Sequence, residues 1–184
     1  MSTYTVAAFL LLSLFLPTTE PTSHYWRSSG CKSIRQPNSQ CFCSGTSNGR
    51  SLAGSEDRIQ DLTTMYENCT RVYGNVEITH LTKTTLRNWT DADFSKKLKI
   101  FEHIQEIKGY LLIYNVDIRS IDFPNLKIIW GDDLLDDNSA LTLSSNLELK
   151  ELRMPKLRAI QRGNVRIENS TFLCYLQSKV NWNE

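Results

Sequence analysis

An apolar pattern that occurs four times restricts most strongly what this chain can fold into. Each copy places three large apolar residues at intervals of three and follows them with a glycine. The copies are Tyr66, Cys69, Val72 and Gly74; Phe101, Ile104, Ile107 and Gly109; Phe123, Leu126, Ile129 and Gly131; Met154, Leu157, Ile160 and Gly163. Such self-similarity indicates a repeat architecture, in which each unit buries its apolar face against the next.

The same spacing also fits one stripe of an α-helix, so a helix is the alternative. Pro124 and Pro155 stand inside two copies, however, where a proline in a helix interior costs about 3 kcal/mol. Short β-rich segments follow the glycines at Val76–Ile78, Leu111–Ile113 and Val165–Ile167, and after a loop at Ala140–Leu143. Their alternation is typical of strands. We therefore expect a mainly β fold, a solenoid whose coils are joined by loops of unequal length.

Two segments lie outside these coils. Ser55–Asn68 predicts an amphipathic helix that would cap the open end of the first coil, with acidic residues in its first turn. Its apolar face would carry Ile59, Leu62, Met65 and Tyr66. After the last coil, apolar bulk comes from Tyr175, Leu176, Val180 and Trp182.

The N-terminus contains a short apolar run, Val6–Leu16, that ends at Pro17. A membrane-spanning helix needs about 20 apolar residues, so the run is typical of a signal peptide rather than an anchor. We assign residues 1–19 to a signal peptide and 20–40 to an N-terminal extension, with a buried hydrophobic helix as the alternative for the apolar run. No second run of this kind follows. The sequence therefore predicts an extracellular protein that does not insert into a membrane by itself.

Cysteines and glycosylation signals agree with secretion. The chain has five cysteines, an odd number that leaves at least one without a partner in the chain. Three N-glycosylation sequons begin at Asn68, Asn88 and Asn169. The formal net charge is only +1, which argues against nucleic acid as a partner.

Several motifs together carry a family resemblance. They are CSGTSNG from Cys43, YENCTRVYGNVEIT from Tyr66, GYLLI from Gly109, FPNLKIIWGD from Phe123, and GNVRI, LCYL and NW between Gly163 and Trp182. The region from Cys41 to the C-terminus resembles the first L domain of the epidermal growth factor receptor family. The L domain of the insulin receptor is similar in the last third but lacks the cysteine motif at the start. The resemblance implies a right-handed β-helix with a capping helix over residues 41–184.

The resemblance also implies how the cysteines pair. Cys43 would pair with Cys69, which on a chain-entropy model stabilises the domain by about 3.5 kcal/mol. Cys31 and Cys41 would form an additional pair, as in some invertebrate members. The counterpart of Cys174 pairs with a cysteine-rich module that follows the domain, so Cys174 is expected to be unpaired here.

A metal site built on Cys41 and Cys43 is the alternative, but none of His24, His80 and His103 stands at a ligand spacing from these cysteines. Carboxylates gather at Asp132, Asp133, Asp136 and Asp137, without the spacing of a calcium loop, and a solvated loop explains them. We expect no cofactor and no metal.

The chain carries no hydrolase, metalloprotease, P-loop or protein-kinase motif. We therefore expect no enzymatic activity, although full-length relatives are receptor tyrosine kinases.

In the family that the chain resembles, a polypeptide ligand lies against one face of the L domain. Carried over by position, the ligand-binding residues are Arg50, Leu52, Gly54, His80, Asn115, Asp136, Ser144 and Ser145. The alternative is that these are ordinary exposed residues of a domain that does not bind.

Two functions follow from this resemblance. In the first, the chain is the ligand-binding domain of a growth-factor receptor tyrosine kinase, with an EGF-like polypeptide as its partner. In the second, it is a complete secreted single-domain protein that acts as a decoy for the ligand or pairs with a receptor chain. In both, the isolated chain is expected to be an extracellular monomer.

Overall fold

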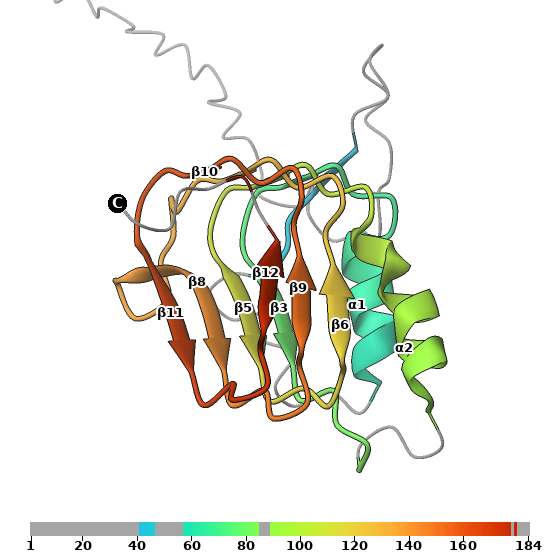
Figure 1. Ribbon diagram of the computed structural model, residues 1–184. Coiled ribbons are helices and arrows are strands. Elements are labelled where there is room, and N and C mark those ends of the chain that lie inside the picture. Colours follow the sequence, from blue (N-terminus) through green and yellow to red (C-terminus); the bar gives the residue numbers. More distant parts are fainter. Residues whose placement is uncertain (1–40, 47–56, 85–88, 178, 180–184) are drawn as a thin grey trace, which may run out of the picture.

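The computed structural model describes residues 41–46, 57–84, 89–177 and 179. These residues form a mainly β structure of three sheets with a few short helices (Figure 1). The first sheet contains β1 (Phe42–Cys43), β2 (Arg71–Val72), β4 (Glu106–Ile107), β7 (Ile128–Ile129) and β10 (Ala159–Ile160). The second contains β3 (Val76–Thr79), β5 (Leu111–Tyr114), β8 (Ser139–Ser144) and β11 (Asn164–Glu168). The third contains β6 (Ser120–Asp122), β9 (Glu151–Arg153) and β12 (Tyr175–Gln177).

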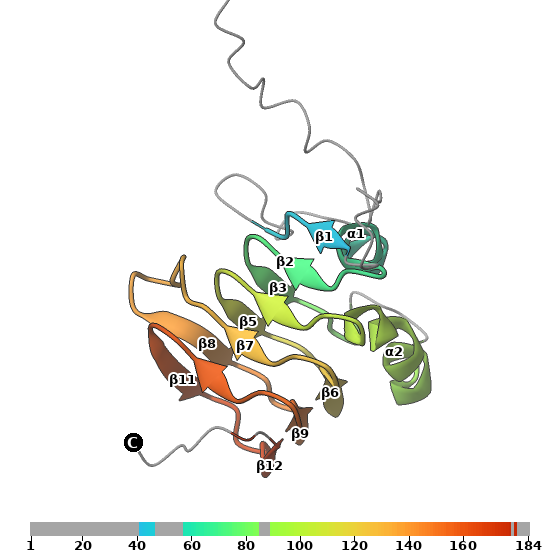
Figure 2. The ribbon, with the colours of Figure 1, turned by 90° about the horizontal axis from the view of Figure 1, so that it is seen from above.

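The chain visits the sheets in the same order again and again, and we call each such visit a pass. The first pass supplies β2 and β3; the second, β4 to β6; the third, β7 to β9; the fourth, β10 to β12. Corresponding strands of successive passes pair in parallel. Figure 2 shows the passes stacked from β1 at one end to β12 at the other.

The repeat seen in the sequence sets this pairing. The third apolar residue of each copy occupies the same place in the first sheet, where Val72 pairs with Ile107, Ile107 with Ile129, and Ile129 with Ile160. All but Ile160 of the repeat's apolar residues are fully buried. Pro124 and Pro155 lie in turns, so the helical alternative is wrong for these copies.

The first residues of the first three copies, Tyr66, Phe101 and Phe123, form an aromatic column through the core. The rings of Tyr66 and Phe101 are 5.6 Å apart between centroids, and those of Phe101 and Phe123 are 5.1 Å apart. Offset or tilted ring pairs at these distances add to the stability gained by burying the rings.

The predicted helix is α1 (Arg58–Tyr66), which ends two residues before the predicted end. Asp57 is its N-cap, and the Asp57 side chain accepts a hydrogen bond from the Gln60 amide at 3.0 Å. Ile59, Leu62 and Tyr66 face the core, as predicted. Instead of lying across the end of the stack, α1 lies beside β1 (Figure 2).

A second helix, α2 (Asp91–Lys97), continues into the 3₁₀ turn η2 (Leu98–Phe101) and was not predicted. A capping box starts it, because the Thr90 hydroxyl accepts from the Asp93 amide while the Asp93 carboxylate accepts from the Thr90 amide. In Figure 2, α1 and α2 continue the row formed by β6, β9 and β12. The helices therefore take the side of the third sheet in the earliest part of the stack.

Glycines are required where the passes approach one another. Gly131 has a positive φ of 67°, which a residue with a side chain rarely adopts. A Cβ atom at Gly109 would overlap the side-chain oxygen of Asn75 from the preceding pass. Both glycines belong to the repeat, so its last position is fixed by backbone geometry and close packing.

The assignments of residues 1–19 to a signal peptide and 20–40 to an extension lie outside the described residues. Among the residues that the structure describes, no helix has the length and apolar character needed to cross a membrane.

Candidate functional site

The second sheet presents one side to the core and the other outward. Val76, Ile78, Leu111, Ile113, Leu141 and Leu143 point inward and are fully buried. Because side chains alternate along a strand, the residues between them point outward. We call this second set the outward face; it consists of Glu77, Thr79, Leu112, Tyr114, Thr142, Ser144, Arg166 and Glu168.

Tyr114 is the exposed aromatic residue of the outward face. Its side chain lies in the row that also contains Thr79, Ser144 and Glu168. The residue is 36% exposed, and its ring meets that of His80 edge-on with centroids 5.1 Å apart. Aromatic side chains with one exposed side are common anchors in protein interfaces, so Tyr114 is a candidate contact residue.

His80 is the first of four residues that stand at equivalent positions, each directly after a strand of the second sheet. We call these four residues the corner column. His80, Asn115, Ser145 and Asn169 directly follow β3, β5, β8 and β11 and have φ values of 57°, 52°, 56° and 46°. Each of the first three amides donates to the next pass, His80 to the Tyr114 carbonyl at 3.0 Å, Asn115 to Ser144 at 3.1 Å and Ser145 to Glu168 at 3.0 Å. Partial burial lowers the pKa of His80, and the positive charge of Arg58 lowers it further.

The structure thus brings together four of the predicted ligand-binding residues. His80, Asn115 and Ser145 lie side by side in this column, and Ser144 lies next to it on the outward face. Three of the other four predicted residues, Arg50, Leu52 and Gly54, lie outside the described residues.

Asp136 lies at the other end of the outward face, in the loop before β8. Its carboxylate accepts a hydrogen bond from Arg166 at 3.2 Å, and Arg166 also pairs with Glu168 at 2.8 Å. Hydrogen bonding to Glu168, followed by the negative charge of that carboxylate, raises the pKa of Arg166. Asp136 therefore reaches the outward face through Arg166, a residue that the sequence analysis did not select.

The clustered Asp132, Asp133, Asp136 and Asp137 are all exposed, as expected for a solvated loop, and some of their carboxylates also make specific contacts. Asp132 accepts from Arg162 at 2.6 Å, and Asp133 accepts from the Asn75 side chain at 2.7 Å. Among the described residues, no group of three or more histidine, cysteine or acidic side chains could hold a metal ion. The loop's charges instead tie it to neighbouring passes.

Asn75 is a second residue that the sequence analysis missed. It is 2% exposed, and its side-chain oxygen accepts from the Tyr110 amide at 3.0 Å. Its carbonyl accepts from the Tyr66 hydroxyl at 2.9 Å and from the Thr46 amide at 2.9 Å. Asn75 therefore joins the segment after β1, the first pass, the second pass and the loop that precedes β8. Its place directly after a repeat glycine is the signal that could have identified it.

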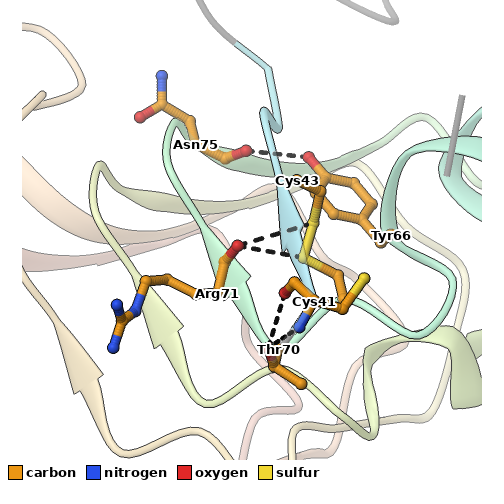
Figure 3. The surroundings of a disulfide bond; sticks show 7 residues. Cys41, Cys43, Tyr66, Thr70, Arg71 and Asn75 are labelled. Atoms are coloured by element: carbon orange, nitrogen blue, oxygen red, sulfur yellow. Dashed lines mark hydrogen bonds between the residues drawn. A yellow bond between two sulfur atoms is a disulfide. The ribbon is translucent and has the colours of Figure 1, made fainter. Parts of the chain in front are cut away.

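A disulfide joins Cys43 in β1 to Cys69, the pair that the resemblance implies, with the two Cα atoms 6.0 Å apart (Figure 3). Both sulfur atoms lie near the Arg71 carbonyl, at 3.9 Å and 3.4 Å. Cys41 is also disulfide-bonded, while its expected partner Cys31 lies outside the described residues. Cys174 has a free, exposed thiol.

Comparison with known sequences identifies the class of protein that has these features. The sequence model of the receptor L domain family matches residues 68–184, so the chain belongs to that family. Within it, the chain is an L domain of the epidermal growth factor receptor family. What matches is an L domain and not a kinase domain.

Three relatives illustrate the relationship. Human receptor tyrosine-protein kinase erbB-4 is 30% identical over 158 residues, which are 82% of this chain and 11% of that receptor. The chicken epidermal growth factor receptor is 35% identical over 149 residues, covering 77% of this chain and 20% of the relative. The epidermal growth factor receptor of Drosophila melanogaster is 30% identical over 149 residues, covering 78% and 10%. The chain thus spans a fifth or less of the length of these relatives.

Proposed function

We propose that this domain is the extracellular ligand-binding L domain of an epidermal growth factor receptor-like receptor tyrosine kinase, and that it binds an EGF-like polypeptide. We also propose that its passes form a right-handed β-helix, and that the domain spans residues 41–184. Family membership supports the class of ligand, because two of the relatives are named as receptors for epidermal growth factor. The proposed extracellular location follows from the same relationship.

The outward face of the second sheet is the proposed ligand site, and exposed Tyr114 beside the corner column is the observation that carries this proposal. The rigid sheet holds Tyr114 between Thr79 and Ser144, so the ring is already positioned before a ligand arrives. A preorganised aromatic side chain loses little conformational freedom on binding.

The rim of this site would be polar. The proposed contacts are His80, Asn115, Ser144 and Ser145 at one end and Asp136 at the other, together with Arg50, Leu52 and Gly54. Arg166 lies between carboxylates of Asp136 and Glu168, which neutralise its charge. The face therefore favours a ligand that places an apolar side chain on Tyr114 and makes hydrogen bonds around it.

Tyr114→Ala, with Tyr73→Ala as its matched control, tests the site. Tyr73 is 51% exposed but follows β2, in a different sheet from the outward face. EGF-like polypeptides would be titrated by calorimetry into the full chain carrying Cys174→Ser, which removes the free thiol. Tyr114→Ala should weaken binding about tenfold or more, and Tyr73→Ala by about twofold or less.

The absolute affinity tests the proposed role as part of a receptor. If a complete receptor binds at about nanomolar concentration, one domain without the tethered remainder of the site should bind at about micromolar concentration. Nanomolar one-to-one binding would instead support a protein that binds its ligand autonomously. Loss of affinity in Tyr73→Ala but not in Tyr114→Ala would place the ligand on another sheet.

A further inference from the structure

Two glycosylation sequons lie in the part of the chain that the structure describes, and their surroundings differ. One begins at Asn68 and the other at Asn169, and both asparagines are exposed with left-handed backbones, at φ values of 59° and 46°. An N-glycosylation signal requires asparagine and a hydroxyl residue two positions later. The accessibility of that third residue therefore matters as much as that of the asparagine.

The third residue of the first sequon, Thr70, makes hydrogen bonds through its side chain and its backbone. Its hydroxyl donates to the Cys41 carbonyl at 2.6 Å and accepts from the Cys41 amide at 2.9 Å (Figure 3). Its own amide donates to the same Cys41 carbonyl at 2.8 Å, and its carbonyl accepts from the Gln105 amide at 2.8 Å. In the folded domain, every polar group of Thr70 is already engaged.

The middle residue of this sequon, Cys69, is also fixed in position. Cys69 is fully buried, is bonded to Cys43, and donates its amide to the Tyr66 carbonyl at 2.9 Å. A transferase that must reach both Asn68 and the Thr70 hydroxyl would have to pull this segment away from β1. The disulfide prevents that movement.

The sequon at Asn169 is open in comparison. Thr171 is exposed, and the middle residue, Ser170, makes a local hydrogen bond to the Glu168 carbonyl at 3.1 Å. The folded domain therefore presents this sequon at its surface, so Asn169 serves as an internal control for Asn68.

We propose that Asn68 accepts its glycan only before the Cys43–Cys69 disulfide closes, so that glycosylation and disulfide formation compete at this one place. In the transfer, the Asn68 side-chain nitrogen loses a proton and bonds to the first sugar carbon, while a lipid-linked pyrophosphate leaves. In disulfide formation, the two thiols lose two protons and two electrons to the disulfide of an oxidoreductase. The inference rests on the proposed extracellular function, because both reactions require entry into the secretory pathway.

Because of the order of synthesis, glycosylation and disulfide formation can compete as soon as Asn68 and Cys69 have been made. Cys41 and Cys43 precede Asn68 in the sequence, so both are already present when Asn68 and Cys69 emerge. Once attached, a glycan on the exposed Asn68 is compatible with the closed fold. The protein should therefore leave the cell as two forms, with and without the glycan at Asn68.

The test measures the occupancy of Asn68 and Asn169 in the full chain made by secreting cells. Cells are grown with and without a membrane-permeable reductant, glycans are removed enzymatically in heavy-oxygen water, and the labelled peptides are quantified by mass spectrometry. Occupancy at Asn68 should be partial and should rise with reductant, while occupancy at Asn169 stays constant. An Asn68 occupancy that is complete, or that does not respond to reductant, overturns the proposal.

Variants separate the disulfide from general misfolding. Cys43→Ser should raise occupancy at Asn68, whereas Leu157→Ala, which opens a cavity in the last pass, should leave it unchanged. An equal rise in both variants would overturn the inference, because any slowly folding chain would then behave the same way. If Asn68 and Asn169 are both unmodified under all conditions, the proposed extracellular location fails; if Asn169 alone is occupied and Asn68 stays empty in Cys43→Ser, only the inference fails.

Discussion

The two ends of the stack are closed to different degrees. At the N-terminal end, β1 pairs with β2, the Cys43–Cys69 disulfide joins β1 to the first pass, and Val72 and Val76 are fully buried. In the fourth pass, the equivalent residues Ile160 and Val165 are only partly buried.

Other apolar residues of the fourth pass are more exposed still. Ile167 is 46% exposed, although its partners in the second sheet, Leu143 and Ile113, are fully buried. Phe172, which follows β11, is 60% exposed. Among the described residues, no strand pairs with the outer edges of β10, β11 and β12. The comparison shows that burial in this fold comes from a neighbour on each side, rather than from the apolar character of a residue alone.

The largest expected effect comes from truncating the same repeat position in an inner and an outer pass. Ile107→Ala should lower the free energy of unfolding by about 4 kcal/mol, because Ile107 is fully buried between Val72 and Ile129. Ile160→Ala should cost about 1 kcal/mol, because less buried area is lost. Denaturation in urea measures both values. Equal losses would mean that the fourth pass is covered as completely as the second.

The sequence was informative where each pass repeats the same burial. The apolar triplets recur because every copy packs on the next, so strands of the second sheet, which follow the copies, could be predicted. The two-residue strands of the first sheet lie within the copies and were not predicted as strands. The helix α1 was also predictable, since Ile59, Leu62 and Tyr66 all bury the same face. The third sheet was missed for a physical reason. Its strands β6 and β9 have three residues each with one buried side chain, Ile121 or Leu152, which is too little to show an alternating pattern.

The candidate site depends on contacts between distant residues, which a local pattern does not contain. Alternation in the second sheet would have selected Leu112, Tyr114 and Arg166 as outward residues, but it could not show that Tyr114 stays exposed. The link from Asp136 to Arg166 joins residues 30 positions apart. Likewise, α2 begins with a capping box at Thr90, but Phe94 alone among its residues is buried, so the apolar signal was weak.

A second comparison uses two asparagines that follow repeat glycines. Asn75→Ala should destabilise the domain by about 2 kcal/mol, because it leaves the Tyr110 amide without its bond to the Asn75 side chain. Asn164, which follows Gly163 in the last pass, is exposed and bonds through its side chain to Asn138 at 2.5 Å. Asn164→Ala should change stability by about 0.5 kcal/mol or less. Similar losses in the two variants would contradict the difference between the ends of the stack.

The smallest expected effect on stability comes from the charge of Glu106 in the first sheet. Glu106 and Ala159 occupy equivalent positions in their strands of this sheet. Arg71 donates to the Glu106 carboxylate at 2.8 Å, and the Trp130 ring nitrogen donates to it at 3.2 Å. Burial by itself would raise the pKa of Glu106, but hydrogen bonds from Arg71 and Trp130, with the charges of Arg71 and Lys108, outweigh it and lower the pKa. The ionised carboxylate is therefore the form that stabilises the fold.

Glu106→Gln should cost about 1 kcal/mol at neutral pH. A lowered pKa in the folded state gives stability that is complete above the unfolded value of about 4.3 and is lost as the pH falls through the folded value. The difference in the free energy of unfolding between the wild type and Glu106→Gln should thus shrink below about pH 4.

Glu151 is the matched control, since it also pairs with an arginine, Arg153 at 3.1 Å, but its side chain is 41% exposed. Glu151→Gln should have a smaller effect at every pH, because solvent screens an exposed pair. A Glu106→Gln difference that is constant from neutral to acidic pH would show that this carboxylate contributes through packing rather than charge.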